Sequence, residues 1–139
     1  MAAEMLWDAD LVVNSVNLSN RVRSIIVTRN HEDLDSTAMG AQARGHYAGL
    51  RDDSMQVNLF QDFETGSTEA TISAVLGLNA GASIVAKKGS GAVAASNPSY
   101  TMNGFALTHT PINGEVGEMH MTDVTLVPAQ GSWITKAVA

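Results

Sequence analysis

Cysteine is absent from this chain of 139 residues, and several other chemically useful groups are scarce. Without a thiol, the chain cannot build a disulfide framework, a thiolate metal site or a cysteine nucleophile. Aromatic residues make up only 5% of the sequence, with two Trp, two Tyr and three Phe. Carbohydrate-binding surfaces usually present exposed aromatic rings, so this scarcity weakens the hypothesis of a carbohydrate-binding module without excluding it.

Charge is also scarce, and it is mostly negative. Charged residues are 16% of the chain, whereas ordinary soluble domains have about 25%. The net charge is −6 and the eight Lys and Arg residues are scattered, which argues against a protein that binds nucleic acid by neutralising phosphates. A surface with few charges favours a protein that is covered by copies of itself, although a weakly charged monomer has the same composition.

Long apolar runs and catalytic motifs are missing as well. The apolar runs are only a few residues long, so we expect no contact with a membrane, and the first residues lack the basic region of a secretory signal. No nucleophile elbow, phosphate loop, dinucleotide fingerprint or zinc-protease helix is present. We therefore expect neither an enzyme nor a cofactor.

Two patterns of histidine and carboxylate resemble weak metal sites. Glu118 and His120 are two positions apart on a predicted strand, and His109 lies on the neighbouring one. The segment HEDLD at 31–35 is acidic but lacks the spacing and the glycine of an EF-hand loop. Because most metal sites need three or four well-placed donors, solvated side chains explain both patterns better, and we expect no metal. Solvation is also expected for the carboxylates that flank one predicted strand, namely Asp52, Asp53, Asp62 and Glu64.

Alternating apolar residues and turn signals predict a mainly β protein with one helix. The predicted strands cover residues 10–18, 21–29, 53–63, 82–88, 99–109, 115–127 and 133–138. Because strands precede and follow a single helix instead of alternating with helices, we expect an antiparallel β-sandwich or rolled barrel. The length suits a single domain over 1–139.

The helix is predicted over about 66–78. Ser67 or Thr65 can cap its first turn, where acceptor side chains satisfy unpaired N–H groups. The core-facing stripe follows the i, i+3, i+4 rule and consists of Ile72, Val75 and Leu76.

A long excursion separates two predicted strands, at about 30–52. Structureless loops of this length are uncommon in compact domains and are usually functional. Glycines divide the segment into short pieces that carry isolated apolar side chains, which favours an ordered arm that contacts another subunit. The residues expected at that contact are His31, Glu32, Asp33, Leu34, Asp35, Met39, Tyr47 and Leu50.

Several segments together resemble the tail tube (major tail) proteins of long-tailed bacteriophages. They are RVRSIIVTR at 21–29, the arm pieces DSTAMG and GLRDDS, the helix region QDFETGSTEATISAVL, and the C-terminal stretch from Ser96 to Pro128. The resemblance spans most of the chain, from about Val16 to Lys136, but none of these pieces is a catalytic motif.

The resemblance implies a β-sandwich or rolled barrel flanked by one helix. It also implies hexameric rings that stack into a hollow tube for transiting DNA, with the arm bridging one ring to the next. The expected partners are other copies of the chain and the tape measure, terminator and distal tail proteins at the tube ends. The expected location is the virion tail, after assembly in the host cytoplasm. The alternative is a β-sandwich binding module outside a tube, such as a capsid decoration or carbohydrate-binding domain.

A channel for DNA should carry few cationic side chains, because Lys and Arg bind phosphates. No Lys or Arg occurs between Asp52 and Thr68 or between Ala92 and Thr135. We therefore expect the strands at 53–62 and 115–123 to line the lumen. Their polar candidates are Gln56, Asn58, Glu115, Glu118 and His120.

Overall fold

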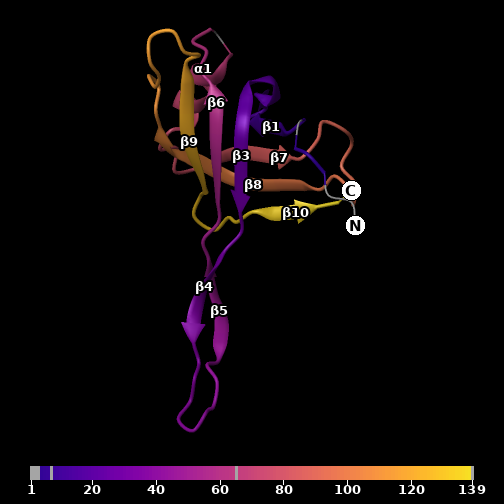
Figure 1. The fold of residues 1–139 in the computed structure, drawn as a ribbon, viewed down its shortest axis with the longest axis vertical. Coiled ribbons are helices and arrows are strands. Elements are labelled where there is room, and N and C mark those ends of the chain that lie inside the picture. Colours follow the sequence, from indigo (N-terminus) through magenta and orange to yellow (C-terminus); the bar gives the residue numbers. More distant parts are fainter. Residues whose placement is uncertain (1–3, 7, 65, 139) are drawn as a thin grey trace.

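The computed structural model describes residues 4–6, 8–64 and 66–138, and antiparallel β-strands are their main regular structure (Figure 1). The strands are β1 (Asp10–Val13), β2 (Val16–Asn17), β3 (Val22–Thr28), β4 (His31–Asp35), β5 (His46–Arg51), β6 (Ser54–Phe60), β7 (Ala82–Lys87), β8 (Ser99–His109), β9 (Met121–Pro128) and β10 (Thr135–Ala137). A 3-10 turn spans Ser19–Arg21, and the α-helix α1 spans Thr68–Val75. The antiparallel, mainly β class predicted from the sequence is confirmed.

One large sheet forms the body of the molecule, in the order β2-β1-β7-β8-β9-β6-β3, with β10 paired to β8. The first hairpin turns at Asn14 and Ser15, which both have positive φ, as a two-residue type I′ turn requires. In Figure 1, β3, β6 and β9 run along the long axis, whereas β7, β8 and β10 cross it. The sheet is therefore rolled, so that its two parts face each other across one core.

The long strand β8 joins the two parts of this rolled sheet. Its first half pairs with β7 and β10, and its second half pairs with β9. Gly104 lies where the partners change, and a Cβ there would collide with the carbonyl oxygen of Val127. Glycine is required at this point because the two backbones approach too closely for a side chain.

Alternating side chains of both parts fill a single core. Met55, Val57 and Leu59 of β6 are buried, as their period-2 spacing predicts. The strands β1, β7, β8 and β9 and the helix add most of the remaining buried side chains, including Leu11, Val13, Ile84, Met102, Val124, Leu126, Ile72 and Val75.

The helix is shorter than the sequence predicts, and this corrects one assignment. Ile72 and Val75 are fully buried, but Leu76 is 47% exposed and is not part of the helix. Leu76 adopts an extended conformation and forms a parallel bridge with Ala106 of β8, and the N–H of Gly77 donates to the Ala106 carbonyl. The edge of β8 thus ends the helix early. Ser67 occupies the N-cap position without a capping bond, and Thr65, the other predicted cap, lies outside the described residues. Among the described residues, no helix is long and apolar enough to cross a bilayer.

The strand predicted over 115–127 begins only at Met121. Met121 pairs with Phe60, which is the last residue of β6. Residues 110–120 have no partner strand beyond that point, and they form a loop with positive φ at Gly114 and Gly117. Glu115, Glu118 and His120 therefore lie in a loop and share no strand face.

Candidate assembly surfaces

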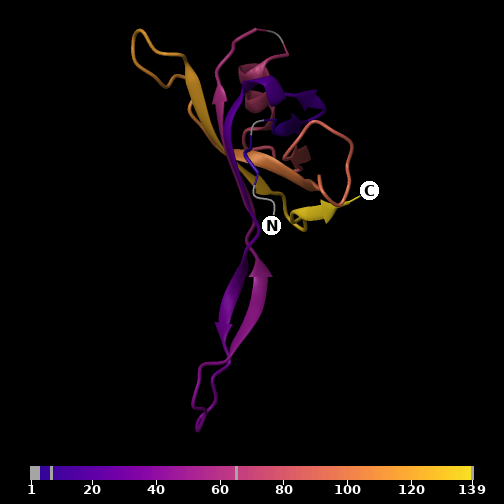
Figure 2. The same ribbon diagram turned by 45° about the vertical axis from the view of Figure 1, so that its right-hand side comes forward.

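The predicted arm is a β-hairpin that projects from the end of the body (Figures 1 and 2). Among the described strands, β4 and β5 pair only with each other, with Leu34 opposite Tyr47 and Asp35 opposite His46. Every side chain of β4 is exposed. A two-stranded ribbon in water is marginally stable at best, so this hairpin has the form of an element completed by a partner.

The two faces of the hairpin differ in chemistry. One face is polar, where the Nδ1 atom of His46 lies 2.8 Å from a carboxylate oxygen of Asp33. On the other face, the Leu34 side chain lies across Gly49 and beside the exposed ring of Tyr47. The apolar side of the arm thus stays in solvent, and no other sheet strand among the described residues pairs with it.

A buried carboxylate fixes the root of the arm. Asp53 accepts hydrogen bonds from the backbone N–H groups of Asn30 and Ile134, both at 2.9 Å. The guanidinium of Arg51 adds two more, at 3.2 and 2.8 Å. These bonds join the strand entering the arm, the strand leaving it and the C-terminal segment.

The environment of Asp53 also shifts its ionisation. Burial alone raises the pKa of this carboxyl, but the two backbone N–H groups and the Arg51 guanidinium outweigh burial and hold the pKa below its usual value. Asp53 is only 3% exposed, so the expectation that it is solvated is wrong. The sequence contains its signal, a carboxylate directly before an alternating strand, but two of its three partners, Asn30 and Ile134, come from distant segments.

A second surface is the outer face of the sheet formed by β3, β6 and β9. Cross-strand pairing places Ser24, Asn58 and Asp123 in one row. The next row contains Ile26, Gln56 and Thr125, and the two rows line a shallow groove of about 340 Å³. The structure therefore brings Gln56 and Asn58 together, as the sequence predicts, and adds Ser24, Asp123 and Thr125, which sequence reasoning missed.

Cations are almost absent from this polar face. Asn58 donates to Asp123, so the middle of the face carries an amide and a carboxylate. Arg23 lies at a bulge in β3 near one end of the face, where its guanidinium contacts the sulfur of Met121. Apart from Ile26, which is 57% exposed, the two rows offer hydroxyl, amide and carboxylate groups.

Three solved structures resemble the chain over most of its length. A chain of the native gene transfer agent virion superimposes with a TM-score of 0.73 at 12% identity, covering 96% of this chain and 99% of that chain. A chain from the extended sheath–tube complex of the PVC extracellular contractile injection system has a TM-score of 0.68 at 10% identity, with coverage of 97% and 91%. A chain from the C6-symmetric tail of an empty gene transfer agent particle has a TM-score of 0.63 at 13% identity, with coverage of 83% and 82%.

The chain has a tail-tube fold. The likeness covers 96% and 97% of this chain in two of these comparisons, so it includes the elements that carry the arm and the polar face. No protein-family model and no curated protein matches the sequence. The fold is therefore retained at a level of identity where few side chains are shared.

The predicted lumen residues in the 110–120 loop lie at one end of the tail-tube fold, away from the middle of the polar face. The ring of His120 stacks on Phe63 at 5.5 Å between centroids, and its Nε2 accepts from the backbone N–H of Asn113 at 3.3 Å. Glu115 and Glu118 are exposed in the same loop. The assignment of these three residues to a lumen-facing strand is wrong, because no strand exists there.

His109 belongs to a different cluster from Glu118 and His120. Its buried ring places Nε2 3.5 Å from a Glu69 carboxylate oxygen, which also lies 3.4 Å from the Gln61 amide nitrogen. This group ties α1 to the end of β8. Among the described residues, no set of three or more His, Asp and Glu side chains converges as metal ligands do.

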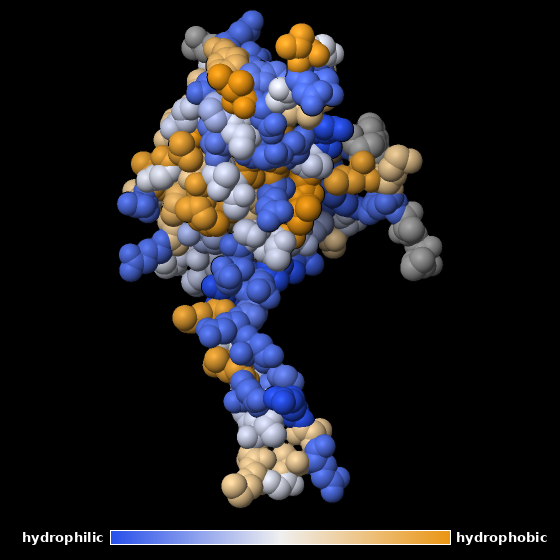
Figure 3. Space-filling view, turned by 60° about the vertical axis from the view of Figure 1, so that its left-hand side comes forward, coloured by the Kyte–Doolittle hydropathy of each residue, from blue (hydrophilic) through white to orange (hydrophobic). Residues whose placement is uncertain are grey.

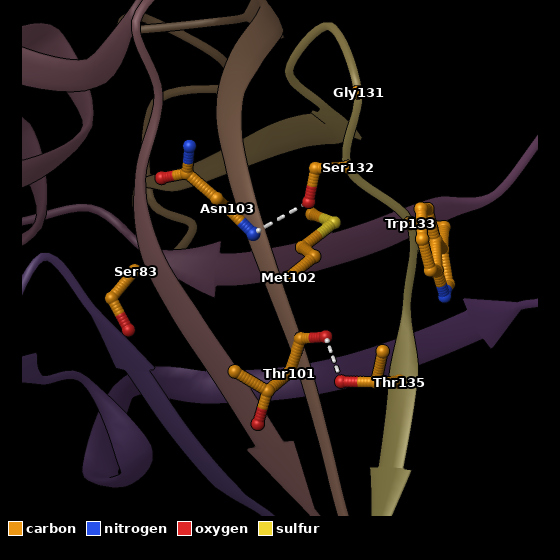
Figure 4. Close-up of a pocket in the computed structure, with 8 residues that line it drawn as sticks. All are labelled: Ser83, Thr101, Met102, Asn103, Gly131, Ser132, Trp133 and Thr135. Carbon is orange, nitrogen blue, oxygen red and sulfur yellow. Dashed lines mark hydrogen bonds between the residues drawn. The ribbon is translucent and has the colours of Figure 1, made fainter.

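A groove of about 300 Å³ crosses the other part of the sheet, beside β10 (Figure 4). Trp133 stands at one side of it, and the Ser132 hydroxyl accepts from the Asn103 backbone N–H at 3.1 Å. None of the described residues that line this groove is titratable. The groove can offer hydrogen bonds and one aromatic face, but no acid, base or nucleophile with a perturbed pKa.

Proposed function

We propose that this chain is the structural subunit of a hollow tail tube through which DNA passes. The observation that carries the proposal is the polar outer face of the β3-β6-β9 sheet, which is poor in cations and continuous across three strands. A surface of amides, hydroxyls and carboxylates does not hold phosphates, whereas Lys and Arg would bind them and release counterions. The tail-tube fold, found also in a C6-symmetric tail, supports this function.

In the proposed ring, six copies place this polar face toward the axis. The edge of β3 supports lateral contact, because β3 pairs with β6 on one side and ends the sheet on the other among the described strands. An exposed strand edge is a template for pairing with another chain. Ring closure satisfies these edge groups in all six copies at once.

The arm contacts a neighbouring subunit in this proposal, through the residues from His31 to Leu50 that the sequence singles out. Its exposed Leu34, Met39, Tyr47 and Leu50 side chains become buried only on assembly. The tube ends then meet other tail proteins, and the assembled tube lies in the virion tail after assembly in the host cytoplasm.

The test is electron microscopy of the purified chain over a range of concentrations. We expect hollow rods from the wild-type protein. A shortened variant provides the matched comparison, because the N–H of Ser36 bonds to the Gly45 carbonyl at 2.9 Å and a two-residue Asn-Gly turn can therefore replace 37–44. This variant should remain folded and lose the ability to form rods.

Single small particles at every concentration would contradict the tube and favour the alternative of a β-sandwich binding module. Rods formed equally well by the shortened variant would contradict the role of the arm tip while leaving the tube intact.

A further inference from the structure

The 110–120 loop is a built structure, held at both of its ends. Asn113 makes three of the bonds that hold it. Its backbone N–H donates to His120, and its backbone carbonyl accepts from the N–H of Met121 at 3.2 Å. The side-chain amide of Asn113 donates to Asp123 at 3.2 Å. The Gln61 amide bonds to the Pro111 carbonyl at 2.9 Å. These contacts hold the loop to Gln61 next to β6 and to Asp123 of β9, so it is an ordered connection between β8 and β9.

The loop presents three apolar side chains to solvent, which we call the crest: Ile112, Val116 and Met119. Ile112 is 85% exposed, Met119 is 69% exposed and Val116 is fully exposed. The loop also carries Glu115 and Glu118 and contains no Lys or Arg. An ordered, acidic loop with outward apolar side chains has the composition of a contact surface.

The crest and the arm lie at opposite ends of the molecule. In Figures 1 and 2, the orange loop between β8 and β9 projects at one end of the long axis, and the arm projects at the other. The space-filling view shows apolar atoms at that end of the body and along the arm (Figure 3). Copies arranged head to tail therefore bring the arm of one to the loop of the next.

The arm tip, residues 36–45, complements the loop in charge. Arg44 is its one charged residue, and Met39 is fully exposed in the same segment. Arg44 pairs at 3.0 Å with Asp35, but both side chains are more than half exposed. Because exposed ion pairs of this kind contribute little, Arg44 can exchange Asp35 for another carboxylate at small cost.

We infer that the crest receives the arm tip of a second copy in the adjacent ring, with Met39 on the apolar crest and Arg44 beside Glu115 and Glu118. A contact between two different patches repeats without closing and so builds an open stack of rings. This inference rests on the proposed tube, and it names the surface that the arm meets.

The absence of cysteine allows a direct test by cross-linking. In a variant carrying both M39C and V116C, oxidation of assembled tubes should give a ladder of covalent oligomers on a non-reducing gel. Because a disulfide needs Cα atoms about 4.4–6.8 Å apart, bismaleimide linkers of increasing length are used in parallel. The matched control is M39C with A92C, since Ala92 lies in an exposed loop elsewhere, and it should give no ladder.

A charge exchange provides an independent readout. R44E alone, or E115R with E118R, should raise the protein concentration needed for assembly by roughly five- to tenfold, because like charges then face each other. The three changes together should restore it to within about twofold of wild type. Far-UV circular dichroism checks that each variant is folded, as expected for exposed positions.

This inference would be overturned if wild-type tubes form, no linker gives a ladder with the double-cysteine variant, and the charge variants assemble at the wild-type concentration. That result would leave the proposed tube standing. Absence of tubes from wild type at every concentration would defeat both. A ladder specific to V116C, with rescue by the charge exchange, supports the contact.

Discussion

The carboxylate of Asp53 offers the sharpest test of how the arm is attached to the body. Its side chain is fully buried and accepts four hydrogen bonds, two on each oxygen. The substitution D53N keeps the shape of the group but replaces one oxygen by an N–H₂ donor. Whichever oxygen is replaced, one backbone N–H and one Arg51 N–H then face a donor instead of an acceptor.

The magnitude follows from those two losses. A buried donor left without a partner costs about 1–3 kcal/mol, and hydrogen bonds to charged groups contribute about 1.5–3 kcal/mol. The Arg51 side chain is 29% exposed, so water replaces part of what it loses. We expect D53N to lower the free energy of unfolding by about 3 kcal/mol, toward the lower end of the cost of breaking a buried ion pair.

Urea unfolding measures this change, on a background that carries the shortened arm tip so that assembly does not interfere. With a slope of about 1–3 kcal/mol per molar urea, the midpoint should fall by about 1–3 M. The matched control is D52N at the exposed neighbouring position, which should change stability by less than about 0.5 kcal/mol.

The pH dependence of this difference has a definite sign. The pKa of Asp53 is lower in the folded protein than in the unfolded chain, so the carboxylate stabilises the fold above its unfolded pKa of about 3.9. That stabilisation is lost as the pH falls below this value and through the folded pKa. The difference in the free energy of unfolding between the parent and D53N should therefore be largest at pH 7 and should shrink below about pH 4.

Equal midpoints for the parent and D53N at pH 7 would refute the proposed attachment of the arm root. If the difference in unfolding free energy stays constant on acidification, the lost stability comes from packing and not from the ionised carboxylate.

Three further predictions concern the core, the bend in the sheet and the polar face. I72A should destabilise the protein by about 2–5 kcal/mol, because it empties a fully buried site, whereas L76A should cost under about 1 kcal/mol; thermal unfolding compares them. G104A should give insoluble or unfolded protein on expression, because the new Cβ meets backbone, while G89A has room for its Cβ and should stay soluble. Q56K should assemble into tubes but slow DNA delivery, most strongly at low salt, and normal delivery by that variant would remove this face from the channel.

The sequence alone determined the features that depend on near neighbours. Period-2 alternation located β6 and β8 because each buries one face along its own length, and the length of the arm was equally local. The absence of cysteine, the low charge and the lack of motifs removed whole classes of chemistry before any coordinates were considered.

The tertiary structure decided where elements stop and which side chains meet. Leu76 continues the helical spacing, yet it forms a bridge with Ala106 at the edge of β8 instead of another helical turn. Residues 115–120 alternate like a strand, but they lie beyond the last residue of β6 that could pair with them. The two backbone bonds to Asp53, from Asn30 and Ile134, join segments that are far apart in sequence, and so does the row of Ser24, Asn58 and Asp123. Local patterns report which face of an element is apolar, but a strand exists only where another strand supplies its hydrogen bonds, and that partner is set by the fold of the whole chain.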